Sequence, residues 1–138
     1  MKTLRHLFIA LAALAAPALP AAAEDSDSAA RIEFQEQKHD FGTIGENGGP
    51  VSCEFTYTNT GSSPLLILNA AASCGCTRPE YSKKPLAAGK SGKIKVTYLP
   101  KGRPGEFNKT IIVRTNDKKN KKVTLKISGF VTPAASTK

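Results

Sequence analysis

The sequence predicts an all-β fold, an Ig-like β-sandwich of about seven antiparallel strands. Apolar residues recur at every second position in several short segments, which is the period of a half-buried strand. Glycine and proline mark the junctions between these segments. After the N-terminal 23 residues, no segment places apolar residues at the three-and-four spacing of an amphipathic helix over roughly ten positions. Short strands separated by turns are typical of a sandwich.

The expected strands follow one another as short alternating segments. In VSCEFTYTN, the side chains of Val51, Cys53, Phe55 and Tyr57 share one face, and polar residues occupy the other. Residues 65–68 are apolar throughout, which indicates a more fully buried strand. The polar segment NDKKNK joins the last two strands as a turn. The expected strands lie at residues 32–34, 41–45, 51–59, 65–68, 93–99, 107–115 and 121–131.

The N-terminus has the layout of a secretory signal peptide. Lys2 and Arg5 precede the apolar run Leu7–Ala16, and small alanines end the segment at Ala23. An apolar run of about ten residues is too short to span a bilayer, which takes roughly 20 helical residues. We therefore expect export to the periplasm or outside a bacterial cell, where disulfides persist. The expected organisation is a signal peptide at 1–23, a polar tether at 24–30, an Ig-like domain at 31–132 and a flexible tail at 133–138.

Charge is distributed unevenly along the chain. The sequence carries a net charge of +9. Glu24 to Thr77 holds eight acidic and two basic residues, a net −6, whereas Arg78 to Lys126 holds fifteen basic and three acidic residues, a net +12. The simpler interpretation is that lysines solvate exposed strand faces and protect edges. Alternatively, the basic half contacts an anionic surface or the acidic half of another copy. A nucleic-acid partner is not expected, because no recognised binding motif accompanies the charge.

Three cysteines are the candidate functional residues. If the segment TGSSP joins two strands as a hairpin, Cys53 lies opposite about Ala71 and close to Cys74 and Cys76. A disulfide from Cys53 to either would close a loop of about 20 residues and stabilise the fold by roughly 3 kcal/mol. Alternatively, Cys53 is a small buried apolar residue. Cys74 would then bridge Cys76 if Gly75 adopts a positive φ, and so small a ring would be easily reduced.

Metal binding and redox exchange remain alternatives for the same cysteines. Two thiolates at this spacing suit Cu(I), with His39 as an additional candidate ligand. A closed zinc site takes four ligands, which the three cysteines and the single histidine after residue 23 barely supply. A cysteine paired with His39 lacks a recognisable orienting group, so no hydrolase is expected. No cofactor is expected apart from the Cu(I) alternative.

A series of short motifs resembles one family over nearly the whole chain after residue 23. The motifs are Asp40–Ile44, Phe55, Asn59–Gly61, Pro64–Leu65, Ser73–Pro79, Ala88–Gly89 and Asn108–Thr115. Their order resembles the bacterial domain-of-unknown-function family 1573, secreted Ig-like domains related to Hydin and ASH-type domains. The resemblance implies a seven-stranded sandwich with the two-cysteine motif in the loop after the hairpin, and it implies no activity.

Together these observations predict an exported, non-enzymatic binding or structural module of the cell envelope, whose partner is a protein or another envelope component. Sandwich domains bind through end loops or by accepting a strand at an edge. Gly75, Thr77 and Pro79 are expected to shape the Cys-Gly-Cys loop, and a disulfide to fasten it. The alternative is a periplasmic thiol site that binds Cu(I) or exchanges disulfides.

Overall fold

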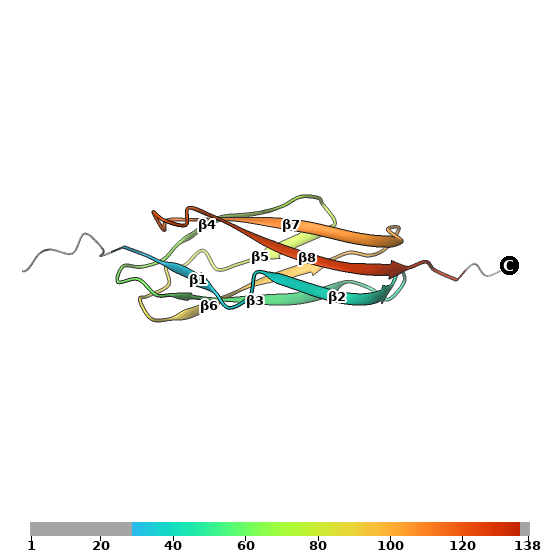
Figure 1. Ribbon diagram of the computed structural model, residues 1–138, viewed down its shortest axis with the longest axis horizontal. Coiled ribbons are helices and arrows are strands. Elements are labelled where there is room, and N and C mark those ends of the chain that lie inside the picture. Colours follow the sequence, from blue (N-terminus) through green and yellow to red (C-terminus); the bar gives the residue numbers. More distant parts are fainter. Residues whose placement is uncertain (1–28, 136–138) are drawn as a thin grey trace, which may run out of the picture.

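The computed structural model describes residues 29–135 and confirms the all-β sandwich (Figure 1). Its strands are β1 (Ile32–Phe34), β2 (Lys38–Gly45), β3 (Val51–Asn59), β4 (Ile67–Ala72), β5 (Thr77–Glu80), β6 (Ser91–Tyr98), β7 (Gly105–Thr115) and β8 (Lys122–Thr132). One sheet has the strand order β1-β3-β6-β5 and the other the order β2-β8-β7-β4. Within the described range, no helix is long and apolar enough to cross a lipid bilayer.

The first part of the domain changes sheets between β1 and β2. Strand β1 pairs antiparallel with β3, whereas β2 pairs parallel with β8 in the opposite sheet. The expectation of purely antiparallel strands was therefore wrong for β2. Its register with β8 shifts between Asp40 and Thr43, where Gly42 has a φ of 67° and its N–H donates to Asp40 Oδ1 at 2.8 Å. A β-bulge of this kind bends the strand and interrupts the regular ladder.

The expected hairpin between residues 51–59 and 65–68 is also wrong. Strands β3 and β4 belong to different sheets, so the segment between them crosses the sandwich. The buried Asn59 explains this crossing. Its Nδ2 donates to the carbonyls of Ser63 at 2.8 Å and Leu86 at 3.0 Å, and its Oδ1 accepts from the Gly61 N–H at 3.0 Å. These bonds hold the chain in a tight arch instead of returning it alongside β3.

The core lies between the two sheets and is built from the alternating side chains. Buried residues come from both sheets, and the largest share comes from the central strands β3, β6, β7 and β8. Tyr98 of β6 and Phe107 of β7 stack across the interface with ring centroids 3.9 Å apart. Burying an aliphatic or aromatic side chain contributes about 1.5–3 kcal/mol, so this core is the main source of stability.

A buried carboxylate ties the beginning of the domain to the turn between β7 and β8. Asp117 is fully buried and accepts hydrogen bonds from the Ile32 N–H at 3.0 Å and the Lys119 N–H at 2.8 Å. Burial alone would raise the pKa of Asp117, but these bonds and those from Asn120 hold the pKa below its usual value. The side chain of Arg31 pairs with the same carboxylate at 3.4 Å. Asp117 therefore remains ionised inside the fold.

Candidate functional site

The three cysteines are not gathered as the hairpin register predicts. Cys74 and Cys76 form a disulfide, with Cα atoms 5.3 Å apart, and Cys53 is a free thiol. Cys53 lies on β3 opposite Val96 of β6, and β6 separates β3 from β5. Two strand spacings, roughly 9.5 Å, therefore lie between Cys53 and the strand that follows the disulfide, beyond the roughly 7 Å that a bridge allows.

Cys53 is a small buried apolar residue, as the alternative to a Cys53 disulfide predicts. Its side chain faces the core and is 8% exposed. Burial raises the pKa of its thiol to about 11, which leaves very little thiolate at neutral pH. Cys53 is therefore a packing residue rather than part of a reactive site.

The disulfide closes the turn between β4 and β5. Cys74 is half-buried, whereas Cys76 is 2% exposed. The Cys76 N–H donates to Cys74 Sγ at 3.3 Å. The Thr77 hydroxyl lies 3.8 Å from Cys74 Sγ and 3.7 Å from Cys76 Sγ, and Thr77 is 3% exposed. Two hydrogen-bond donors therefore face the sulfur atoms inside the turn.

Backbone hydrogen bonds hold the same turn independently of the disulfide. The Thr77 N–H donates to the Cys74 carbonyl at 3.3 Å, and the Leu99 N–H donates to the Cys76 carbonyl at 2.9 Å. Gly75 is not among the glycines with positive φ, and a Cβ added there meets no heavy atom within 4 Å. The expected reason for Gly75 was thus wrong, because the turn forms without a left-handed residue.

Strand β4, which leads into this turn, is an open edge of its sheet. The Ser73 N–H donates to the Thr110 carbonyl of β7 at 2.9 Å, so this position bonds to the neighbouring strand. Bonding alternates along an antiparallel ladder. With the register Ala71 to Ile112, residues 69, 71 and 73 bond to β7, and Ala70 and Ala72 direct their N–H and C=O groups toward the free edge.

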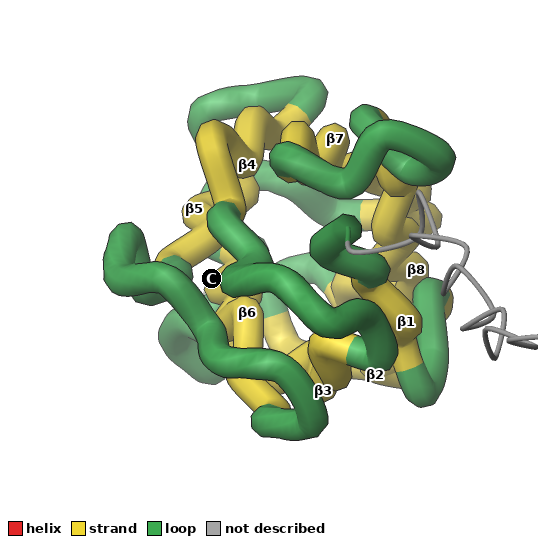
Figure 2. Tube along the Cα trace, turned by 90° about the vertical axis from the view of Figure 1, so that its left-hand side faces the viewer, coloured by secondary structure: helices red, strands yellow, loops and turns green. Residues whose placement is uncertain are grey.

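The neighbouring edge, β5, is closed to strand addition. Figure 2 shows β4 and β5 next to each other on one side of the sandwich. Since the Cys76 carbonyl accepts from the N–H of Leu99, the residue directly after β6, the outward positions of β5 are Thr77 and Pro79. The Thr77 N–H is already bonded to Cys74, and Pro79 has no N–H to donate. Proline at an outward position is a common means of protecting an edge.

The other two edges also carry protective features. Strand β1 has three residues, and β2 is interrupted by the bulge at Gly42. Short or bulged edge strands resist pairing with another chain. Strand β4 has a register shift only at its start, between Ile67 and Asn69, and runs regularly from there to Ala72.

The open part of β4 is uncharged and bears an exposed apolar side chain. Leu68, at the register shift, is 60% exposed. Leu65 is paired with Leu86 through two backbone hydrogen bonds, so the edge is covered just before β4 begins. We call residues Leu68–Ala72 the β4 edge. It lies between this pair and the disulfide turn.

His39 is not brought to the cysteines. It lies on β2, at the opposite end of the strand order from β4, where its ring contacts Phe41 with centroids 4.6 Å apart. Three strand spacings, roughly 14 Å, separate these two strands. Residues 29–135 contain no group of three or more His, Cys, Asp or Glu side chains that could hold a metal ion.

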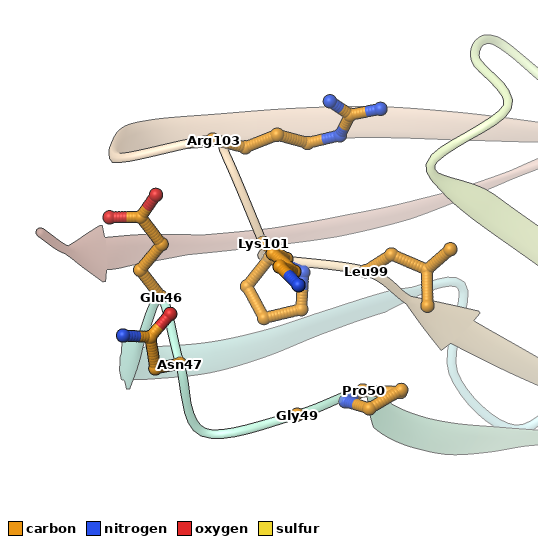
Figure 3. A pocket seen from close by; sticks show the side chains of 8 residues that line it. Glu46, Asn47, Gly49, Pro50, Leu99, Lys101 and Arg103 are labelled. Atoms are coloured by element: carbon orange, nitrogen blue, oxygen red, sulfur yellow. The ribbon is translucent and has the colours of Figure 1, made fainter. Parts of the chain in front are cut away.

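A depression of about 460 Å³ lies near the disulfide turn, between the β2–β3 and β6–β7 loops (Figure 3). Glu46 lines it, but its carboxylate accepts from the Gly102 N–H at 3.1 Å and the Ala134 N–H at 2.8 Å. Figure 3 shows Arg103 extending toward Leu99 and away from Glu46. The Glu46 carboxylate therefore fastens two backbone segments, and the depression is a less complete site than the β4 edge.

Comparison with known proteins gives the chain a family. The protein family of unknown function DUF1573 matches residues 32–131. The chain belongs to this family. This match confirms the resemblance expected from the sequence. The Ser-Cys-Gly-Cys-Thr segment of the chain forms the turn described above. Among curated proteins, none matches the chain.

Solved structures share the fold. A protein of unknown function from Porphyromonas gingivalis W83 is 14% identical with a TM-score of 0.66, covering 78% of this chain and 50% of its own. The ASH/PapD-like domain of human CEP192 is 18% identical with a TM-score of 0.60, and the match covers 95% of this chain and 100% of that domain. The periplasmic chaperone SfaE is 9% identical with a TM-score of 0.51, and the match covers 76% of this chain and 59% of the chaperone. The DUF1573 chain thus spans about half the length of the Porphyromonas chain, and at these identities the likeness shows the fold alone.

The β4 edge was missed by sequence reasoning, although the sequence carries a signal for it. From Phe55 to Thr77 the chain has no charged residue, whereas charged residues make up 22% of the whole. Strands at a protected edge usually carry lysine or proline. The absence of charge is therefore a signal for an unprotected strand, whereas the position of that strand at the edge of a sheet follows only from the fold.

Proposed function

We propose that this DUF1573 protein is an exported, non-enzymatic binding module that adds an extended segment of a partner polypeptide to the β4 edge. The observation that carries the proposal is the pair of outward-facing residues, Ala70 and Ala72, on an edge without charge or proline whose register is regular from Asn69 to Ala72. Strand addition of this kind derives affinity from backbone hydrogen bonds and specificity from the alternate side chains.

The expected affinity follows from the length of the edge. Ala70 and Ala72 together offer about four hydrogen bonds, each contributing roughly 0.5–1.5 kcal/mol net. Covering Leu68 adds about 1–2 kcal/mol. Association costs at least roughly 4 kcal/mol in lost freedom. These contacts alone therefore give a net binding free energy of at most about 4 kcal/mol, which corresponds to a dissociation constant of about 1 mM or above, and tighter binding requires further contacts from partner side chains.

The chemistry of the edge defines the partner segment. Asn69 and Ala71 are exposed and small, so the added strand can carry bulky side chains over the outer face of the sheet. An apolar residue opposite Leu68 would remove that side chain from water. The partner is thus an extended, apolar or alternating segment of four to six residues (about the length of an ordinary strand).

Two variants and a matched control test this proposal. Peptides are selected from a displayed random library on the wild-type domain, and their affinities are measured by fluorescence anisotropy. Ala70→Pro removes an outward N–H without removing a hydrogen bond to β7, and Leu68→Lys places a charge on the edge. Both should weaken binding at least tenfold. Phe130→Lys is the control, because Phe130, 47% exposed on β8, is the other large exposed apolar residue within residues 29–135.

The result that contradicts strand addition is equally specific. Peptides that bind Ala70→Pro and Leu68→Lys as tightly as the wild type, or that lose affinity for Phe130→Lys instead, use another surface. Circular dichroism of each variant verifies that the fold is retained. Export is tested separately, since a protein processed in a bacterial envelope should begin at Glu24 when its intact mass is measured.

A further inference from the structure

The Cys74–Cys76 disulfide lies where the β4 edge ends, and its two cysteines differ in exposure, because Cys74 is half-buried and Cys76 is buried. We propose that this disulfide is an exchange site for cysteine thiols of polypeptides bound along the β4 edge, with Cys74 as the cysteine that is attacked and Cys76 as the leaving thiolate. The identity of the substrate rests on the proposed function above, whereas the reactivity of the disulfide does not.

Accessibility determines which sulfur reacts. Cys74 is half-buried and Cys76 is 2% exposed, so a thiolate from outside reaches Cys74 Sγ first. The attacking thiolate forms a bond to Cys74 Sγ, the bond between the two sulfurs breaks, and Cys76 leaves as a thiolate. A second thiol of the substrate then attacks the substrate sulfur that is bonded to Cys74, and Cys74 leaves as a thiolate. The substrate is thereby oxidised to a disulfide, and Cys74 and Cys76 are left as a dithiol with the two electrons.

The turn contains donors for the thiolates that this sequence creates. The Thr77 hydroxyl lies at nearly equal distances, 3.8 Å and 3.7 Å, from Cys74 Sγ and Cys76 Sγ, so it can donate to whichever sulfur carries the charge. The Cys76 N–H at 3.3 Å is a second donor to Cys74 Sγ. Hydrogen bonds to the charged form favour the thiolate, which is both the nucleophile and the leaving group. Thr77 is therefore a positioning residue for both steps.

The backbone keeps the two cysteines together when the bond is open. The Cys74 carbonyl is bonded to the Thr77 N–H, and the Cys76 carbonyl is bonded to the Leu99 N–H. These bonds do not involve the sulfur atoms, and they hold the turn in the same shape in the dithiol form. When no second substrate thiol attacks, the Cys76 thiolate is positioned to attack Cys74 Sγ again, which re-forms the protein disulfide and releases the substrate thiol unchanged.

The substrate binds next to the reacting cysteine. The ladder between β4 and β7 continues to Ser73, the residue directly before Cys74. A strand added to the β4 edge would lie about 4.8 Å from β4 and would pass this end of it. A cysteine near the corresponding end of the bound segment therefore comes close to Cys74. Cys53 does not compete, because it is buried on β3 with β6 between it and β5.

The first experiment uses glutathione and needs no partner. Two variants, each of which retains one of the two cysteines of the turn, are reduced and mixed with oxidised glutathione. The fraction of protein that carries a glutathione mixed disulfide is measured over time by intact mass. Cys76→Ala, which retains Cys74, should react at least tenfold faster than Cys74→Ala, which retains the buried Cys76. Equal rates, or no reaction at Cys74, would overturn the exchange site. Denatured samples of both variants should react equally, which verifies that burial causes the difference.

Thr77 provides a test that a purely structural role would not pass. Thr77→Val keeps the side-chain shape and removes the hydroxyl. In the Cys76→Ala background it should raise the pKa of Cys74, measured from the ultraviolet absorbance of the thiolate against pH. Thr77→Ser, which retains the hydroxyl, should restore the wild-type pKa. An unchanged pKa in Thr77→Val would exclude the positioning role.

The second experiment separates the substrate from the chemistry. The probe is the library-selected peptide with a single cysteine at the end nearest the turn. Ala70→Pro should slow mixed-disulfide formation with this peptide at least tenfold more than it slows the reaction with glutathione, whereas the control Phe130→Lys should leave the rate with the peptide unchanged. If the peptide reacts equally fast with Ala70→Pro, docking along β4 is wrong and the exchange site stands. If glutathione does not react at Cys74, the exchange site is wrong whether or not the peptide binds.

Discussion

Reducing the wild-type protein provides a direct test of what the disulfide does for stability. Cys74 and Cys76 are two positions apart, so their bridge closes a loop of about three residues. The chain-entropy relation gives about 1.6 kcal/mol for such a loop, against about 3 kcal/mol for the loop that a Cys53 bridge would close. For a domain of this size, 1.6 kcal/mol corresponds to a fall of roughly 6–12 °C in Tm. The backbone hydrogen bonds of Thr77 and Leu99 do not involve the sulfur atoms, so we expect them to remain in the reduced form.

The assay is urea unfolding monitored by circular dichroism, with and without a phosphine reductant that does not form mixed disulfides. The same sequence is compared in both states, so no packing change from a substitution enters the difference. We expect a loss of about 1–2 kcal/mol with an unchanged slope against urea. A loss of 3 kcal/mol or more, or a reduced protein that does not fold, would refute the reasoning and make the disulfide a lock for the whole domain.

Three further predictions concern Asp117, the glycines at 75 and 129, and Cys53. Asp117→Asn should lower the free energy of unfolding by about 1.5–3 kcal/mol at pH 7, measured by urea unfolding. The folded pKa of Asp117 lies below its usual value, so the ionised carboxylate stabilises the fold above about pH 4, and this stabilisation is lost as pH falls through the folded pKa. The free energies of unfolding of the variant and the wild type should therefore converge in acid. A difference that stays constant with pH would contradict this. Gly75→Ala should leave Tm unchanged or slightly higher, whereas Gly129→Ala should lower it by several degrees, since its Cβ would lie 2.7 Å from the Phe107 ring; the reverse order would contradict the described turn. Cys53 should not react with a thiol reagent at pH 8 until the protein is unfolded, and rapid native labelling would contradict its burial.

The strands could be predicted because their signal is local. The alternation of Val51, Cys53, Phe55 and Tyr57 predicts a strand at 51–59, and β3 has these bounds. The segment 107–115 likewise agrees with β7, which begins two residues earlier. In each case a side chain's neighbours two positions away determine which face is buried.

The pairing of strands could not be predicted, because it depends on contacts distant in the sequence. Asn59 directs the chain across the sandwich through its hydrogen bonds, one of them to Leu86, 27 residues away. A polar segment such as TGSSP fits a hairpin and an arch equally well when that partner is unknown. The wrong hairpin then placed Cys53 beside the other cysteines.

The candidate site was predicted in part for the same reason. The motif around Cys74 and Cys76 was recognisable from spacing alone, and so was the alternative in which they bridge each other. The position of β6 between β3 and β5 decides between the alternatives, and this position is a property of the sheet order. The open edge depends on which strand ends a sheet and on which residues face outward. Neither can be read from residues 67–72 alone.

The amide hydrogen exchange of β4 tests the proposed strand addition most directly. In the free protein, the amides of Ala70 and Ala72 face the open edge and should exchange rapidly, whereas those of Asn69 and Ala71 are bonded to β7 and should exchange slowly. Saturation with a selected peptide should slow the exchange of Ala70 and Ala72 at least tenfold and change the other two little. Protection of Ala70 and Ala72 already in the free protein, or peptide-induced protection confined to another surface, would contradict the proposed function.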